Sequence, residues 1–471
     1  MARRDQPGTM AVDTVIHGGR VVTADAVRRA DLAIDGETIA AVGSPASMPP
    51  ADVVVDATDR LVMPGVVDPH VHVADPYSYD TYESAGRAAA LGGTTTFIDF
   101  AWQPWVGEGS QFDAEGSLLD GVAWKRERAD DALVDYSLHC GLTREDPDAL
   151  DEVPDVVEAG VPSFKLLTAY EIGLGYGFME RAFEAIAPHD GVAMCHTEDA
   201  SVCDARTARR QAEGRGAPED YPGSRPDYAE AMSAGDVCRL AMAQGCRYYG
   251  AHTTSRLAAD ELARYRAEYG HERVRGETCP HYVTLDDGLF AERGFLPMLA
   301  PPLRTPADND AVFDHLRRGV LDVVATDHTG FTRVSKDVDD WWDATFGMNS
   351  LQTSLPVFHD EAVNRRGASY PFLVRVMCAN PARLFGMPWK GTLEPGTDAD
   401  VVVFDPAHRY TITAADNAGV ADFTLYEGRE VVGRVERTYV RGALLADDGE
   451  VVGTPGHGQF VARERPDWSA P

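Results

Sequence analysis

The chain has 471 residues, 44% of them hydrophobic and 25% charged, so its composition is globular and its length suits one large domain and a smaller one. Its formal net charge of −32 disfavours nucleic acid and anionic membranes as partners, because both require basic surface. No apolar run approaches the roughly 18 residues of a membrane span, and the first ten residues lack the apolar core of a signal peptide. Seven scattered cysteines, an odd number, favour reduced thiols and a cytoplasmic location over a disulfide framework.

The acidic charge is accompanied by a shortage of lysine. Lys125, Lys165, Lys336 and Lys390 are the only lysines, and the other basic residues are arginines. An acidic, lysine-poor surface indicates either a GC-rich genome or adaptation to high salt. Composition alone leaves both explanations open.

Short strands separated by turns are predicted at both ends of the chain, where β-branched runs are punctuated by Gly, Asp and Pro. We therefore expect residues 1–65 and 386–471 to form one small β-sandwich domain. The Gly- and Pro-rich stretch 455–471 is expected to be an arm or a frayed tail of that domain. Residues 66–385 are expected to form a separate α/β domain.

The middle of the chain alternates strands with longer helical stretches, and eight strands can be counted. Eight parallel strands alternating with helices predict a (β/α)8 barrel of the α/β class, whose active site lies at the carboxyl ends of the strands. The predicted strands are 66–72, 94–100, 135–141, 162–168, 191–199, 246–254, 274–280 and 320–328.

The first of these strands ends in the motif VDPHVH, with His70 and His72 two residues apart. Side chains at i and i+2 of a strand point to the same face, so the two imidazoles can bind one metal ion such as zinc. The alternative is that they are two polar residues at a strand end. The spacing alone does not decide between them.

Further polar residues lie at the ends of strands 4, 5, 6 and 8. A lysine at a barrel mouth can keep its charge in solvent, or as a neutral amine it can combine with CO2 to give an anionic carbamate that bridges two metals. Each histidine alone is more often structural than a ligand. Together with the first strand, however, the set places six potential ligands at one rim, namely His70, His72, Lys165, His196, His252 and Asp327.

Many segments carry a resemblance to cyclic amidohydrolases of the dihydropyrimidinase, hydantoinase and allantoinase group, within the amidohydrolase superfamily. The resemblance covers nearly the whole chain and implies a metal-bearing barrel joined to a β-sandwich made from both chain ends. The segments include VIHGGRVV, DPHVHV, GGTTTFIDF, SFKLLTAY, CHTED, SRPDYAEA, ETCPHYVTL, APPLRT, VVATDH, NPARLFG and KGTLEPGTDADVVVFDP.

The resemblance also implies a ligand set for two divalent metal ions, with zinc expected and manganese as the alternative. His70, His72 and Asp327 would hold the more buried metal, and His196 and His252 the other. N6-carboxylated Lys165 and a hydroxide would bridge them. The hydroxide would be the nucleophile, and Asp327 would carry its proton to the leaving nitrogen.

Other residues are expected to contact the substrate. Tyr170 matches the family tyrosine that stabilises the developing oxyanion, although it could be only a packed aromatic. Ala300 would contact the ring through its backbone, and Asp75, in the loop after the first strand, would favour a substituent that donates hydrogen bonds. Asn349 lies in a segment, 347–356, that resembles allantoinases.

The expected function is hydrolysis of the cyclic amide bond of a ureide, a dihydropyrimidine or a hydantoin, to an N-carbamoyl amino acid. Residues 73–75 after His72 include no arginine, which argues against a dihydroorotase. An allantoinase is the nearest alternative. A hydrolase of the superfamily with another substrate and a non-catalytic scaffold are the others, and the resemblance implies a homo-oligomer, a tetramer or a dimer.

Overall fold

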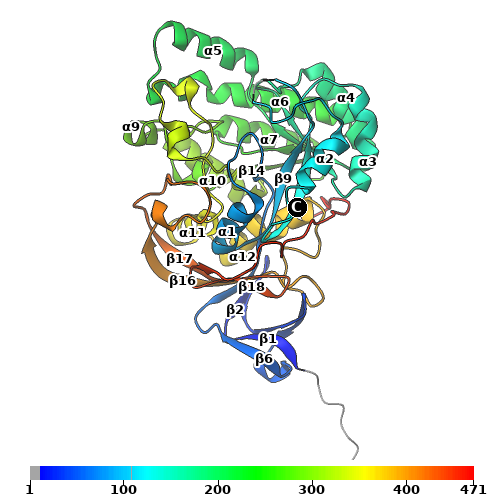
Figure 1. Cartoon of the computed structure of the whole chain (residues 1–471), viewed down its shortest axis with the longest axis vertical. Coiled ribbons are helices and arrows are strands. Elements are labelled where there is room, and N and C mark those ends of the chain that lie inside the picture. Colours follow the sequence, from blue (N-terminus) through cyan, green and yellow to red (C-terminus); the bar gives the residue numbers. More distant parts are fainter. Residues whose placement is uncertain (1–10, 108, 471) are drawn as a thin grey trace, which may run out of the picture.

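A parallel barrel forms the large unit in the upper part of the molecule (Figure 1). The computed structural model describes residues 11–107 and 109–470, so the ten residues examined for a signal peptide lie outside this range. All eight predicted strands are present, in the spatial order of the chain. They are β8 (Val66–Asp68), β9 (Thr94–Trp102), β10 (Asp135–Gly141), β11 (Ser163–Leu167), β12 (Val192–His196), β13 (Arg247–Gly250), β14 (Val274–Thr278) and β15 (Val323–Val324).

The first barrel strand is shorter than predicted. It ends at Asp68 because Pro69 has no N–H to donate to a neighbouring strand. Pairing resumes at Val71, which bridges His328, and the His72 N–H donates to the His328 carbonyl over 2.8 Å. This contact joins the first strand to the last and closes the barrel.

Helices cover the outside of the barrel, and each longer one has a recognisable start. Helix α1, for example, begins after Thr81, whose side chain forms a reciprocal capping box with Ser84. Helix α6 packs between α4 and α7. The longer helices are α1 (Tyr82–Gly92), α2 (Leu118–Arg126), α4 (Tyr176–Ile186), α5 (Ala200–Ala212), α6 (Asp227–Ala243), α7 (Arg256–Tyr269) and α10 (Pro306–Arg317). The shorter ones are α3 (Val153–Glu158), α8 (His281–Thr284), α9 (Leu289–Arg293), α11 (Ser354–His359), α12 (Tyr370–Val374) and α13 (Asn380–Leu384).

Two further sheets lie below the barrel, where the blue N-terminal and orange C-terminal strands come together (Figure 1). A four-stranded sheet has the order β5 (Thr38–Gly43), β4 (Asp31–Asp35), β1 (Val12–His17), β6 (Ala51–Asp56). A seven-stranded sheet has the order β19 (Glu450–Val451), β18 (Ala443–Asp447), β17 (Glu430–Val440), β16 (Val401–Thr411), β7 (Leu61–Pro64), β2 (Arg20–Val22), β3 (Val27–Arg29). Both chain ends therefore contribute to the β-structure, as expected.

Strand β16 shows how the β-structure joins the barrel. Val401 and Val403 point into the core between the two sheets, where they pack with Ile16 and Leu32. Val402 points to the opposite face and packs in the large core of the barrel. Because side chains alternate along a strand, β16 contributes both to the core between the two sheets and to the core of the barrel.

The C-terminal segment lies along the barrel as an arm. The Tyr136 N–H donates to the Gln459 carbonyl and the Val461 N–H to the Tyr136 carbonyl. Farther on, the fully buried Trp468 indole donates to the Leu384 carbonyl over 2.9 Å. Through residue 470 the chain is an arm rather than a frayed tail. Among the described residues, no helix is long and apolar enough to cross a membrane.

All four lysines are buried, each with no more than 2% of its surface exposed. Lys390, for instance, lies within 3 Å of carboxylate oxygens of Asp135, Asp398 and Asp400. The described surface therefore carries its negative charge without any lysine to offset it. All seven cysteines are likewise buried and unpaired.

If the acidic surface is an adaptation to salt, the melting temperature should rise by roughly 5 °C or more between about 0.1 M and 1 M KCl, because the Debye length falls from about 10 Å to about 3 Å and screens the self-repulsion. Calorimetry with KCl and with NaCl tests this, since screening does not depend on the cation. A melting temperature that stays flat over this range would favour genomic composition as the cause.

Candidate metal centre

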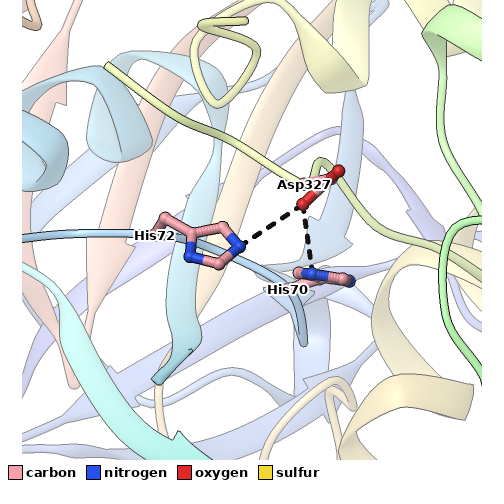
Figure 2. A group of neighbouring side chains, drawn as sticks. All are labelled: His70, His72 and Asp327. Carbon is pink, nitrogen blue, oxygen red and sulfur yellow. Dashed lines mark ion pairs between the residues drawn. The ribbon is translucent and has the colours of Figure 1, made fainter. Parts of the chain in front are cut away.

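Side chains from two strand ends converge at the carboxyl end of the barrel. Figure 2 shows the two histidines of the VDPHVH motif, each joined to Asp327 by a dashed line. Asp327 Oδ1 lies 3.1 Å from His70 Nε2 and 3.6 Å from His72 Nε2. Val71, between the histidines, points away into the apolar core, so both imidazoles face the same point. These three donor atoms lie within 4.8 Å of one another and could hold one metal ion.

The other three predicted ligands lie beside this group. Lys165 Nζ is 3.2 Å from His70 Nε2, and Lys165 is 2% exposed. His196 Nδ1 and His252 Nε2 lie 2.9 Å apart, and the ring centroids of His252 and His70 are separated by 5.3 Å. The fold thus brings all six predicted ligands to one place, although they span more than half of the chain.

Carboxylates behind the histidines fix the orientation of the rings. His70 Nδ1 lies 2.5 Å from Glu277 Oε1, and His72 Nδ1 lies 3.2 Å from Asp75 Oδ2. His196 Nε2 is held by Glu198 Oε2 at 3.0 Å. With one ring nitrogen occupied by a carboxylate, each imidazole presents the other nitrogen to the centre, which is how metal-binding histidines are normally held.

Burial and charge determine the protonation of these groups. Burial lowers the pKa of Lys165 to about 8, which brings the neutral amine within reach near neutral pH. Burial opposes ionisation of Asp327, but His70 and His72 outweigh it and hold the pKa of that carboxyl well below its usual range. The Arg225 guanidinium similarly outweighs burial and lowers the pKa of Glu198 to about 2. Both carboxylates are therefore anionic over the physiological range.

The backbone is strained where the site is built. Tyr170, His252 and Asp327 have positive φ angles of 69°, 31° and 48°, as does Ala74 in the loop after His72 at 46°. Non-glycine residues rarely adopt this region, and such residues gather at functional sites. The sharp turns at these strand ends aim the side chains inward.

The donor set fits divalent metal ions. Four imidazoles, one carboxylate and one lysine amine face a common space, and three of the imidazoles already have a carboxylate on the opposite nitrogen. Nitrogen and carboxylate donors of this kind are those that zinc prefers. The amine alone is a poor partner for the metals, but its carbamate would supply two oxygens that share one negative charge.

A cavity of about 260 Å³ opens above this centre. Its floor is formed by the six converging side chains. Its walls come from loops after several strands and are mostly apolar, with Pro76, Tyr77, Trp102, Leu167, Tyr170, Ala300, Thr329, Phe331, Thr345, Phe346 and Gly347.

The predicted substrate contacts lie in different places. Tyr170, 42% exposed, and Ala300 line the cavity. Asp75 is buried behind His72, where its Oδ2 also accepts the Trp102 indole N–H, so the carboxylate is turned away from the cavity. Asn349 is buried beside His328 in a separate small hollow. Tyr82, the first residue of α1, is also buried, and its hydroxyl donates to Asp99.

Sequence reasoning missed the carboxylates Glu198 and Glu277. Glu277 also accepts the Tyr249 hydroxyl and the His252 N–H, so it connects two histidines of the centre. A signal was available, because Glu277 lies inside the predicted barrel strand 274–280 and Glu198 lies two residues after His196. A carboxylate buried at either place requires a partner.

Comparison with known proteins assigns the chain to a family. The model of the amidohydrolase family matches residues 61–444. The chain belongs to the amidohydrolase family. It is therefore a hydrolase with a metal-dependent barrel, and the expected fold is confirmed.

Its relatives include a D-hydantoinase of Streptomyces coelicolor, 35% identical over 96% of this chain and 98% of that protein. An allantoinase of Salmonella choleraesuis is 31% identical over 97% of this chain and all of that protein. Among solved structures, the dihydropyrimidinase of Brevibacillus agri superposes with a TM-score of 0.91, at 30% identity over 96% of this chain and 99% of that one. These names agree with the expected enzyme class and do not favour a non-catalytic scaffold.

Proposed function

We propose that this amidohydrolase opens the amide bond of a cyclic ureide, a hydantoin or a dihydropyrimidine, to give an N-carbamoyl amino acid. The observation that carries the proposal is the convergence of the six predicted ligands in the lining of a mostly apolar cavity. The ring of such a substrate is planar and uncharged, so it can enter this cavity without a charged partner. The relatives named hydantoinase and dihydropyrimidinase support the same reaction.

Divalent metal ions held by the six side chains would polarise the amide carbonyl and lower the pKa of a water molecule so that it attacks near neutral pH. Asp327 takes the proton of this water and delivers it to the ring nitrogen. The new C–O bond forms, the ring C–N bond breaks, and the nitrogen leaves as part of the carbamoyl group. The hydroxyl of Tyr170, on the cavity wall, donates to the oxygen on which negative charge develops.

The walls favour an apolar ring substituent. Tyr77, Trp102, Leu167, Phe331 and Phe346 supply aromatic and aliphatic surface, and burying such a substituent there is favourable by about 25 cal/mol per Å². The ureido group of allantoin would need hydrogen-bond acceptors instead. Because the Asp75 carboxylate is turned toward His72 and Trp102, it does not supply them.

We also propose that Lys165 is carboxylated and that zinc is the native metal. The buried, partly neutral amine supports the first point, and the imidazole-rich donors support the second. Assembly as a homotetramer or dimer and a cytoplasmic location follow only from the sequence and stay predictions.

A substrate panel tests the proposed reaction. The zinc- or manganese-loaded protein is assayed with dihydrouracil, apolar 5-substituted hydantoins, allantoin and dihydroorotate. We expect the best hydantoin or dihydropyrimidine to exceed allantoin at least tenfold in kcat/KM, a preference of about 1.4 kcal/mol, and the charged dihydroorotate to be poorest. If allantoin were hydrolysed tenfold better than all the others, the enzyme would be an allantoinase.

A further inference from the structure

Arg225 contacts both Tyr170, on the cavity wall, and Glu198, behind His196, and the reaction outlined above assigns it no role. It follows the short helix Pro222–Ser224 and precedes α6. Its side chain is 15% exposed, and its Nη1 lies 2.6 Å from Glu198 Oε2. The same carboxylate oxygen accepts from His196 Nε2 at 3.0 Å. Glu198 therefore connects Arg225 to His196, a predicted metal ligand.

The Arg225 guanidinium also lies over the ring of Tyr170. Its central carbon lies 4.9 Å from the centroid of the tyrosine ring, within the range of a cation–π interaction. The Tyr170 ring also packs against His196, with centroids 5.1 Å apart. Tyr170 is half-exposed and lies on strained backbone, so contacts of its ring determine where its hydroxyl points.

Arg225 is itself held firmly. The Arg304 guanidinium donates to the Arg225 carbonyl, to Thr254 Oγ1 at 3.0 Å and to Glu230 Oε2 at 3.1 Å. Thr254 follows His252 by two residues. The segment that carries Arg225 is therefore fixed to the end of strand β13, while its side chain reaches the ends of β11 and β12.

We propose that Arg225 is a positioning residue that holds the Tyr170 ring from one side and so aims the tyrosine hydroxyl at the reacting carbonyl. This inference rests on the proposed function of Tyr170. A cation against the ring face also draws electron density from the phenol, which makes the hydroxyl a stronger hydrogen-bond donor to a developing oxyanion. Removing Arg225 should therefore slow the chemical step more than it weakens substrate binding.

A double-mutant cycle with Tyr170 separates this role from a structural one. We expect Arg225→Gln to lower kcat about tenfold with KM changed less than about threefold and with both metals retained. Tyr170→Phe should lower kcat by about 10²-fold. In the Tyr170→Phe background, Arg225→Gln should cost less than about twofold, because the hydroxyl that it aims is already absent.

Arg225→Lys keeps a positive charge beside Glu198 but lacks the planar guanidinium that packs on the Tyr170 ring. Its kcat should therefore lie between those of Arg225→Gln and the wild type. If Arg225→Gln does not fold, the same double-mutant cycle with Tyr170→Phe can be measured with Arg225→Lys. Arg264, which lies over Tyr265 on helix α7 away from the cavity, provides the matched control, and Arg264→Gln should leave kcat unchanged.

Equal losses from Arg225→Gln in both backgrounds would overturn the inference. Loss of metal in Arg225→Gln would also overturn it, because Arg225 would then act through Glu198 and His196. A Tyr170→Phe variant with wild-type kcat would instead reject the role of Tyr170 in the proposed function. The two failures are therefore distinguishable.

Discussion

Replacing Lys165 with alanine is expected to remove most of the bound metal and to lower kcat by about 10³-fold or more, roughly 4 kcal/mol of transition-state stabilisation. Lys165 is buried, its Nζ lies 3.2 Å from His70 Nε2, and burial brings its pKa to about 8. The neutral amine can form a bond to the carbon of CO2 and release one proton. The resulting carbamate would offer the metals two oxygens that share one negative charge, and alanine offers none.

Metal content by mass spectrometry and kcat are measured together for this variant. Lys336 provides a matched control, because it is equally buried but donates to the Met298 and Gly347 carbonyls and not to the metal centre. Lys336→Met should keep its metals. Short carboxylic acids added to Lys165→Ala should restore part of both metal and activity by replacing the lost oxygens. Full activity with two metals in Lys165→Ala would contradict the carbamate.

The barrel and the convergence of the six side chains could be predicted because they follow from local rules. Alternation along a strand fixes which side chains share a face, and the carboxyl ends of parallel strands meet at one rim. His196 and His252 needed only these rules. The early end of β8 at Pro69 did not disturb the prediction, because Val71 bridges His328 and keeps both neighbouring histidines on the same side.

The contacts around the ligands could not be predicted in this way. Glu277 orients His70 from 207 positions along the chain, and nothing in either segment identifies the other as its partner. Asp75 is in the predicted loop, but whether its carboxylate faces a substrate or a histidine depends on one rotamer and on the Trp102 indole beside it. The left-handed backbone at Asp327 likewise carries no glycine to reveal it. These features depend on side-chain geometry after the barrel has closed.

Asp327 differs from the other five predicted ligands because it is expected both to bind metal and to carry a proton. Its Oδ1 lies within 3.6 Å of both histidines of the first strand, and the residue lines the cavity. In the proposed reaction the attacking water and the leaving nitrogen would meet there. Asparagine preserves the shape and leaves one oxygen for the metal, but it cannot accept and return a proton. Asp327→Asn should therefore lower kcat by about 10²- to 10⁴-fold while the fold remains intact.

The measurement combines kcat, metal content and the melting temperature, with Asp339→Asn as the control for loss of one exposed carboxylate. Five of the six ligands remain in Asp327→Asn, so the variant should retain most of its metal. Turnover within about threefold of wild type with full metal would show that another group moves the proton. If metal and activity were lost in the same proportion, Asp327 would act only as a metal ligand. Slow turnover with metal and fold retained requires that the carboxylate itself carries the proton to the ring nitrogen.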